Sequence, residues 1–413
     1  MKKPKASGER IGPLNGIVVL DMTQFLAGPF STQILADLGA QIIKLEAPTG
    51  DWSRTLPPHF VDSDSCYYLS INRNKQGVVI DMKAPEGLDL VNQLGKRCDL
   101  VIENFRPGVL DRLGFTYEML SKINPTLIWA SISGFGQTGP YRDRPAYDMI
   151  VQAMSGGMSL TGERGRSPVR AGIPIGDLSA GMYATIGVLA ALEERRNTGK
   201  GKFIDIAMLD CQVAMLTYQA AYYLHSHEVP GRQDRGHESI PTYRSFAAAN
   251  NTELVICANT ERMWQGLCEV LGLNSLVSDP RFITNEKRHK NREKLWPLLE
   301  EAFAIKEAKA WVSHLLKAGV PVGEVNTIAD ALSDPQVVHR QMVLELDGGK
   351  ERKTRVVGNP IKFVENPRIE HVYPPKLGEH SRGIICDMLG VTQKDYEKFC
   401  DEGIVFDPGK AEK

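Results

Sequence analysis

One carboxylate in this sequence has surroundings that suit a nucleophile. Asp177 follows an extended apolar run that ends at Gly176, and a helix rich in glycine and alanine is expected to begin directly after it. Asp177 therefore has two interpretations. It caps that helix, or it is an ionised carboxylate held by the backbone N–H groups and positive end of the helix. The small residues Ser179, Ala180 and Gly181 leave room for a substrate carbonyl, as covalent catalysis by a carboxylate requires.

Basic and amide side chains recur close to the ends of predicted strands. Open α/β sheets bind ligands at the carboxyl ends of their strands, so this recurrence favours a phosphate-bearing ligand. Taken alone, each of these side chains is more typical of a solvated surface charge. The groups are residues 73–75, 81–83, 104–106 and Arg112.

A glycine-rich segment at residues 134–139 fits the GxGxxG pattern of dinucleotide-binding proteins. That pattern also requires a helix at once, and then a second strand followed by an acidic residue, and neither follows here. We therefore expect a glycine-rich substrate loop, with a nicotinamide-dependent dehydrogenase as the less favoured alternative. His225 and His227 are two residues apart, which matches no zinc motif, so no metal site is predicted.

The elements that must position these residues alternate along the first half of the chain. Short β-branched runs are separated by helix-length segments, which indicates a doubly wound α/β fold with a parallel sheet. Two long helices should follow, at 178–196 and 207–224, and then a polar linker. The predicted strands of the sheet are residues 16–20, 42–45, 78–80, 100–102 and 127–132.

The second half of the chain predicts a smaller α+β unit. A strand at 254–257 precedes helices at 263–271, 292–303 and 308–316, and strand patterns return after residue 340. We therefore expect a large Rossmann-like domain whose two parts flank the small one. The expected boundaries are 1–225 for its first part, 226–325 for the linker and small domain, and 326–413 for the C-terminal return.

Composition narrows the class of protein. Among 413 residues, 49 Lys and Arg balance 50 Asp and Glu, which argues against a nucleic-acid partner. The basic, polar start predicts no signal peptide, and the uncharged stretch at 178–192 is too short and too rich in glycine and alanine for a membrane span. Seven scattered cysteines without a CxxC pair are typical of a reduced, cytoplasmic protein.

Motifs along nearly the whole chain resemble those of the class III coenzyme A transferases. They begin with Pro13 to Asp21 and Ala27-Gly28-Pro29, and they end with Leu377-Gly378-Glu379-His380. Between these lie Leu38 to Glu46, Asn72 to Lys75, Glu103 to Gly108 and Gly199-Lys200-Gly201. The resemblance implies an acyl-CoA:carboxylate CoA-transferase that assembles as an interlocked homodimer. A CoA thioester would be its substrate, and no cofactor would be permanently bound.

In that family the nucleophile is the Asp of the Gly-Asp before the helix, which falls on Asp177. The implied reaction forms an aspartyl mixed anhydride and then an aspartyl-CoA thioester, and an acceptor acid reverses the steps. The resemblance places the CoA contacts on Leu26, Ala27, Ile80, Asp81, Met82, Lys83, Asn104, Phe105, Arg106, Arg112, Pro145, Ala146, Tyr147 and Asp148.

Departures from the family pattern bear on the substrate. The formyl-CoA transferase branch carries Gln where Leu26 stands and Arg where Ala47 stands, so specificity for formyl-CoA and oxalate is disfavoured and the adenine end should be held somewhat differently. The α-methylacyl-CoA racemase branch has Gly-His-Asp where this chain has residues 146–148, with tyrosine in place of the histidine. A CoA-thioester racemase or isomerase is therefore the weaker alternative. A catalytically silent CoA-binding protein is the non-enzymatic one.

The segment before Asp177 looks most like the succinyl-CoA:glutarate branch. Arg170 ends this segment, and its guanidinium could bind the distal carboxylate of a dicarboxylic acid through two parallel hydrogen bonds. A surface arginine at the end of a strand explains the same residue equally well. We therefore expect CoA transfer between small dicarboxylic acids such as succinic and glutaric acid.

Overall fold

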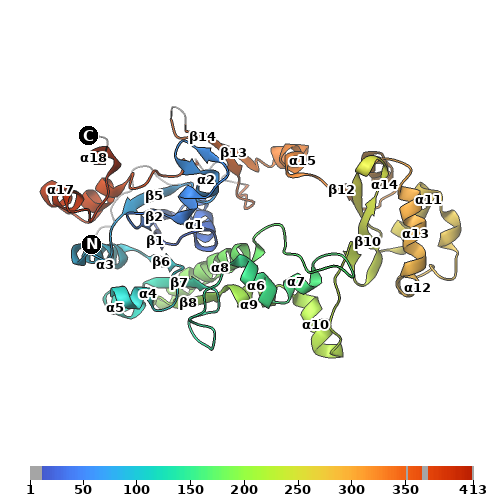
Figure 1. Ribbon diagram of the computed structural model, residues 1–413, viewed down its shortest axis with the longest axis horizontal. Helices are drawn as coiled ribbons and strands as arrows, with labels where there is room; N and C mark the ends of the chain where they lie inside the picture. Colours follow the sequence, from blue (N-terminus) through green and yellow to red (C-terminus); the bar gives the residue numbers. More distant parts are fainter. Residues whose placement is uncertain (1–11, 350–351, 365–370, 412–413) are drawn as a thin grey trace. The chain divides into compact units, whose positions relative to one another are not determined.

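The computed structural model describes residues 12–349, 352–364 and 371–411, and two compact units make up the chain (Figure 1). The first unit contains residues 1–157, 171–220 and 339–413, and the second contains 158–170 and 221–338. The segment 158–170 thus departs from the expected boundaries, because Leu160 accepts a backbone hydrogen bond of 2.9 Å from Gln233 of the second unit. The basic start of the chain lies almost wholly outside the described residues.

A parallel sheet is the centre of the first unit and confirms the expected α/β class. In the described residues it has six strands in the order β5-β2-β1-β6-β7-β8, and every neighbouring pair is parallel. Chain order reverses between β1 and β6, which is where open sheets of this kind bind ligands. The strands are β1 (Val18–Met22), β2 (Gln41–Glu46), β5 (Lys75–Val79), β6 (Leu100–Glu103), β7 (Ile128–Ser133) and β8 (Phe203–Ala207).

Helices cover both faces of this sheet (Figure 1). One face packs on α1 (Ala27–Asp37), α8 (Ile175–Thr198) and α9 (Met208–Ala214). The other packs on α3 (Pro85–Arg97), α5 (Tyr117–Ile123) and the C-terminal α17 (Gln393–Asp401). The remaining short elements of this unit are η1 (Trp52–Thr55), β3 (Phe60–Val61), β4 (Asp64–Ser65), α2 (Cys66–Ile71), α4 (Val109–Leu113), α6 (Asp148–Met154), η4 (Gly383–Met388) and α18 (Pro408–Ala411).

Two predicted helices differ in the structure. The segment 207–224 is not one helix, because β8 ends at Ala207 and α9 is followed by a break before α10 (Thr217–Ser226). Thr217 has a φ of +43° at that break. Helix α8 is longer than the stretch 178–192, and within the described residues it alone has the length and composition to cross a membrane. Half of its apolar window is buried, as in a core helix.

The C-terminal segments return to the first unit through buried polar contacts. Arg73 forms an ion pair with Asp37 and also donates to the Val357 carbonyl at the end of β14. Asn74 accepts a 2.7 Å hydrogen bond from the Val372 backbone. These side chains explain why an Asn-Arg-Asn-Lys run is buried rather than exposed. The returning hairpin is β13 (Val343–Asp347) and β14 (Lys353–Val357).

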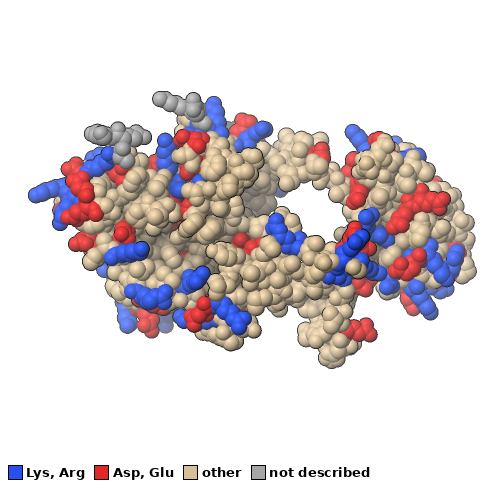
Figure 2. Space-filling model, in the orientation of Figure 1, with Lys and Arg blue, Asp and Glu red and all other residues tan. Residues whose placement is uncertain are grey.

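An antiparallel sheet of order β12-β11-β10-β9 supports the second unit. Its core lies around Trp264, Phe303 and Trp311. Both signs of charge are interspersed over the visible surface, as the balanced composition requires (Figure 2). The elements are α7 (Gly157–Leu160), β9 (Gly236–His237), β10 (Ile240–Ala247), η2 (Ala249–Asn251), β11 (Glu253–Cys257), α11 (Glu261–Leu271), η3 (Asn274–Val277), α12 (Asn285–Lys290), α13 (Arg292–Phe303), α14 (Ala308–Lys317), β12 (Val322–Glu324), α15 (Ile328–Ser333) and α16 (Pro335–His339).

Candidate active site

Asp177 is the third residue of α8, within the first turn of the helix. The N-cap is Pro174, which provides no side-chain hydrogen bond, so the interpretation of Asp177 as the cap is wrong. The carboxylate instead belongs to the first turn, where unpaired backbone N–H groups and the helix dipole favour negative charge. Asp177 is half-buried there.

A second carboxylate fixes the start of α8. Asp148, the first residue of α6, accepts a 2.7 Å hydrogen bond at Oδ1 from the backbone of Gly176. Its Oδ2 accepts another of 2.7 Å from Gln152, whose own Oε1 accepts from the Ala171 backbone at 2.9 Å. A Cβ on Gly176 would lie only 2.9 Å from Asp148 Oδ1. A side chain at position 176 would therefore displace the Asp148 carboxylate from this contact.

Burial and, as the smaller effect, the neighbouring charge of Asp148 together raise the pKa of Asp177 to about 7. Desolvation and a like charge thus oppose the ionisation that the helix N-terminus favours. Carboxylates with a pKa close to neutral are typical of functional sites.

Tyr67 on α2 is a part of this site that the sequence did not indicate. Burial raises the pKa of its phenol to about 12, and the charges of Asp177, Asp51 and Asp148 add to this effect. The phenol is therefore protonated at neutral pH and faces the field of these three carboxylates. A protonated phenol can donate a hydrogen bond, and its electrostatic interaction with Asp177 indicates that the two groups are near each other.

The predicted CoA contacts Leu26 and Ala27 lie at the start of α1, which packs against α8. A Cβ on Gly181 would lie 2.6 Å from the Ala27 carbonyl oxygen, so the two helices approach with no room for a side chain. Asp177 is one helical turn before Gly181, and residues four apart share a helix face. The structure thus brings the candidate nucleophile and the Leu26–Ala27 backbone to the same side of α8.

The turn before Leu26 is held by the half-buried Asn104 and the buried Asp51. Asn104 accepts a 2.9 Å hydrogen bond from the Gln24 N–H and donates one of 2.8 Å to the Gln24 carbonyl. Phe25 has a φ of +63°, and its N–H donates to Asp51 Oδ1 at 3.2 Å. Asp51 is in turn paired with Lys44 at 2.9 Å, and both side chains are inaccessible to solvent. Asn104 thus positions the turn in addition to its predicted contact with CoA.

The other predicted CoA contacts follow the carboxyl ends of β5, β6 and β7. Asp81 donates its backbone N–H to the Ile404 carbonyl at 2.8 Å, which fixes the segment 80–83 on the C-terminal return. Tyr147 is exposed, and its ring meets Phe25 edge-to-face at 6.1 Å. The residues in these segments are Ile80, Asp81, Met82 and Lys83 after β5, Phe105, Arg106 and Arg112 after β6, and Pro145, Ala146, Tyr147 and Asp148 after β7.

Arg170 is exposed and belongs to the segment of the second unit that ends beside Ala171. It does not end a strand, because residues 168–170 form no regular element, and that expectation is wrong. The glycine-rich segment 134–139 is followed by turns and irregular chain, and the next helix begins only at Asp148. The helix that the dinucleotide-binding pattern requires directly after it is therefore absent. No group of three or more metal-ligating His, Cys, Asp or Glu side chains occurs in the described residues.

Comparisons with known proteins agree on one family. The model of the CoA-transferase family III matches residues 14–381. Succinyl-CoA:glutarate CoA-transferase of Mus musculus is 38% identical over 404 residues, which cover 98% of this chain and 92% of that protein. Acetyl-CoA:oxalate CoA-transferase of Acetobacter aceti is 40% identical over 377 residues, which cover 90% and 95%. The crystal structure of a CAIB/BAIF family protein from Brucella suis superimposes with a TM-score of 0.83 at 38% identity, covering 91% and 99%.

Proposed function

The chain belongs to CoA-transferase family III, and from this premise we propose that it transfers CoA between small dicarboxylic acids with Asp177 as the nucleophile. The observation that carries this proposal is the half-buried Asp177 carboxylate in the first turn of α8, one turn before Gly181, which packs on the Ala27 backbone. The names of the two relatives include succinyl-CoA, glutarate and oxalate, which supports dicarboxylic acids as the substrate class.

The proposed reaction passes through two kinds of aspartyl intermediate. An Asp177 carboxylate oxygen attacks the thioester carbonyl of the donor, the C–S bond breaks, and a mixed anhydride and CoA thiolate result. The thiolate then attacks the aspartyl carbonyl, which releases the donor acid and leaves an aspartyl-CoA thioester. The acceptor carboxylate attacks the carbonyl of this thioester, the C–S bond breaks, and a second mixed anhydride and CoA thiolate result. The returning thiolate attacks the acceptor acyl carbon, which gives the new acyl-CoA and regenerates Asp177.

The residues around Asp177 have separate parts in this scheme. With a pKa of about 7, a large fraction of Asp177 is ionised at neutral pH. The ionised carboxylate is also more basic, and so more nucleophilic, than an aspartate with the ordinary pKa. Each addition step places negative charge on a carbonyl oxygen, which requires hydrogen-bond donors. The protonated phenol of Tyr67 and the backbone N–H groups at the start of α1 are the donors we propose for that role.

Exposed apolar side chains on the first unit support association with a second copy. They lie on α6, α8 and α9, three helices that pack against one another, and exposed apolar side chains gathered in this way are typical of a protein interface. We propose that this face is buried in the homodimer that the family resemblance implies. The side chains are Met149, Ile150, Met182, Tyr183, Ile186, Leu189 and Val213. A reducing, cytoplasmic setting suits the seven unbridged cysteines.

The racemase alternative has less support from the site. Tyr147 occupies the place of the required histidine, and Asp148 is engaged with Gly176 and Gln152. A phenol is a far weaker base than an imidazole for removing an α-proton. The intact Asp177 likewise argues against a silent CoA-binding protein.

Isotope transfer tests the covalent scheme directly. With succinyl-CoA and glutarate whose carboxylates carry ¹⁸O, one labelled oxygen should pass through Asp177 into the succinate released in later turnovers. Asp177→Ala should abolish both the label transfer and the formation of glutaryl-CoA, while Asp143→Ala, at an exposed position, should retain both. Transfer of CoA by Asp177→Ala, or turnover without label in succinate, would overturn the assignment. Faster reaction with monocarboxylic acids would overturn the substrate class.

A further inference from the structure

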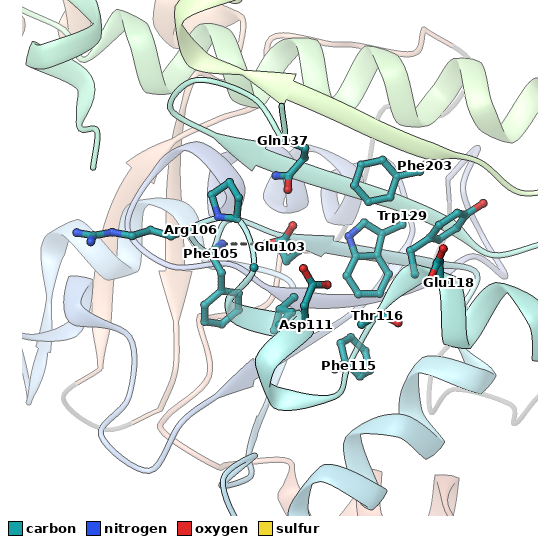
Figure 3. A pocket seen from close by; sticks show the side chains of 14 residues that line it. Glu103, Phe105, Arg106, Asp111, Phe115, Thr116, Glu118, Trp129, Gln137 and Phe203 are labelled. Carbon is teal, nitrogen blue, oxygen red and sulfur yellow. Dashed lines mark hydrogen bonds between the residues drawn. The ribbon is translucent and has the colours of Figure 1, made fainter. Parts of the chain in front are cut away.

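A cavity of about 450 Å³ is lined by residues of β6, β7 and β8 and of the segment 105–111 (Figure 3). Its volume is within the range of small-molecule sites. Aromatic side chains line one side. The Trp129 ring is 5.3 Å from Phe115 and 6.4 Å from Tyr117, and Tyr117 is 5.5 Å from Phe203. Neither Asp177 nor the Leu26–Ala27 backbone contributes to its lining.

Carboxylates line the opposite side of this cavity. Glu103 and Asp111 face the space in front of the aromatic rings, and Glu118 lies at its margin (Figure 3). Arg106, the one basic residue of the lining, extends away from it (Figure 3). The guanidinium groups of Arg112 and Arg142 lie beside Gly108 of the lining, close to Asp111, so this rim of the cavity carries both signs of charge.

Glu103 is the exception among the buried carboxylates of the described residues. Six others have a basic group within 4.0 Å, and no basic group lies that close to Glu103 in the described chain. Its oxygens accept hydrogen bonds from the Phe105 backbone, Ser131 and the Trp129 indole instead. The six pairs are Asp21–Lys75, Asp37–Arg73, Glu46–Arg54, Asp51–Lys44, Asp64–Arg54 and Asp99–Arg195.

A buried carboxylate without a counter-charge is costly to ionise. Burial raises the pKa of Glu103 to about 7, in agreement with the missing cation. The side chain is only 6% exposed, and yet it borders a cavity large enough for a small molecule. A bound cation would give Glu103 the positive partner that a lysine or arginine provides for each of the other six carboxylates.

We propose that this cavity binds a small organic cation, an ammonium compound, at a site separate from the acyl-transfer centre. The positive group would contact Glu103 and Asp111, and its alkyl substituents would pack on Trp129, Tyr117 and Phe203. An ammonium group gains from both parts, because aromatic ring faces attract cations and a desolvated carboxylate pairs with them. The proposal does not depend on the transferase mechanism.

The cavity shares the segment 105–111 with the predicted CoA contacts Phe105 and Arg106. An occupied cavity would therefore contact one side of the segment that Asn104 anchors to Gln24. A competing explanation is that the cavity accepts part of CoA itself, for example the amino group of its adenine. The experiment must separate the two, and displacement by free CoA does so.

Calorimetric titration of the full-length protein provides the test. Choline and butylammonium are the probes, and 3,3-dimethylbutanol and butanol are their neutral counterparts. We expect at least one cation to bind at least tenfold more tightly than its neutral counterpart, in the presence as well as the absence of saturating CoA. Equal binding of cation and alcohol, no binding of either cation at millimolar concentration, or displacement by CoA would overturn the proposal.

Two variants locate the binding. Glu103→Gln keeps the size of the side chain and one acceptor oxygen but removes its charge, and it should weaken binding of the cation at least tenfold. Phe203→Leu removes an aromatic ring at a position that is 38% exposed, so the fold should tolerate the change. The affinity for the cation should also fall in this variant. Glu193→Gln, on the exposed face of α8, is the matched control and should bind like the unaltered protein. Unchanged affinity in Glu103→Gln would overturn the site.

Discussion

The Gly176 N–H and the Asp148 carboxylate are joined by a 2.7 Å hydrogen bond, directly before the candidate nucleophile in the chain. One side chain therefore performs two tasks. It holds the first turn of α8 in place, and its charge opposes ionisation of Asp177. The hydrogen bond needs only an acceptor oxygen, whereas the electrostatic effect needs a charge, so substitution can separate them.

Replacement of Asp148 by asparagine should make the enzyme more active in mild acid relative to its activity at higher pH. Asp148→Asn keeps an oxygen for the Gly176 N–H and removes the charge, so the pKa of Asp177 should fall from about 7. The ratio of kcat/KM at pH 6 to that at pH 8 should rise roughly threefold or more. A pH profile of CoA transfer checks this, with Asp143→Asn as the control. If the fall in activity at low pH occurred at the same pH in Asp148→Asn as in the unaltered protein, the charge of Asp148 would not act on Asp177.

The same raised pKa predicts an unusual dependence of stability on pH. Because the pKa of Asp177 in the folded protein is about 7 against an ordinary 3.8, the folded state binds its proton more tightly than the unfolded state. The contribution of Asp177 to the free energy of unfolding therefore falls as pH rises from about 4 to about 7. Asp177→Asn cannot ionise and should be more stable than the unaltered protein at pH 8, by roughly 1–3 kcal/mol, and similar at pH 4.

Urea unfolding at pH 4.5 and pH 8 measures this difference. Asp143→Asn, at an exposed site, should match the unaltered protein at both pH values. Equal stability of Asp177→Asn and the unaltered protein at pH 8 would contradict a destabilising charge at this position. The result also separates an electrostatically strained nucleophile from a carboxylate with only a structural role, whose loss would destabilise the protein.

The sheet could be predicted because most of its strands are continuous apolar runs buried on both faces, as in β1 and β6. Strand β8 could not, because it is an edge strand whose Phe203 and Asp205 are exposed, so its sequence lacks such a run. The resemblance implied Asp177 from a local motif. Its pKa depends on burial and on Asp148 in a different helix, and neither can be read from the residues beside it.

Asn104 and Tyr67 show a second limit of the sequence. An asparagine after a strand suggested a ligand contact, but only the folded chain shows that its amide bonds to the backbone of Gln24, 80 residues earlier. Tyr67 belongs to a short helix with no motif, and its place near Asp177 follows from the packing of α2 in three dimensions. Long-range contacts of this kind have no local pattern.

A methyl group at position 176 should impair catalysis. In Gly176→Ala the new Cβ would lie 2.9 Å from Asp148 Oδ1, so either the Asp148 carboxylate or the first turn of α8 must shift, and the hydrogen bond between them is strained. We expect a loss in kcat of roughly tenfold to a hundredfold, since small displacements of a nucleophile are costly. Gly172→Ala, where a Cβ would meet no atom within 4 Å, is the matched control and should retain activity. Full activity of Gly176→Ala would show that the spacing to Asp148 is unimportant.

Removal of the Asn104 amide should weaken CoA binding through the turn that it supports. In Asn104→Ala the Gln24 N–H and carbonyl lose both partners, and the backbone before Leu26 becomes less ordered. The KM for the CoA thioester should rise about tenfold, with a smaller change in kcat. Hydrogen exchange of residues 22–27 without CoA distinguishes this role from direct contact. Faster exchange in the variant is expected, whereas unchanged exchange with a raised KM would mean that Asn104 acts only on the ligand.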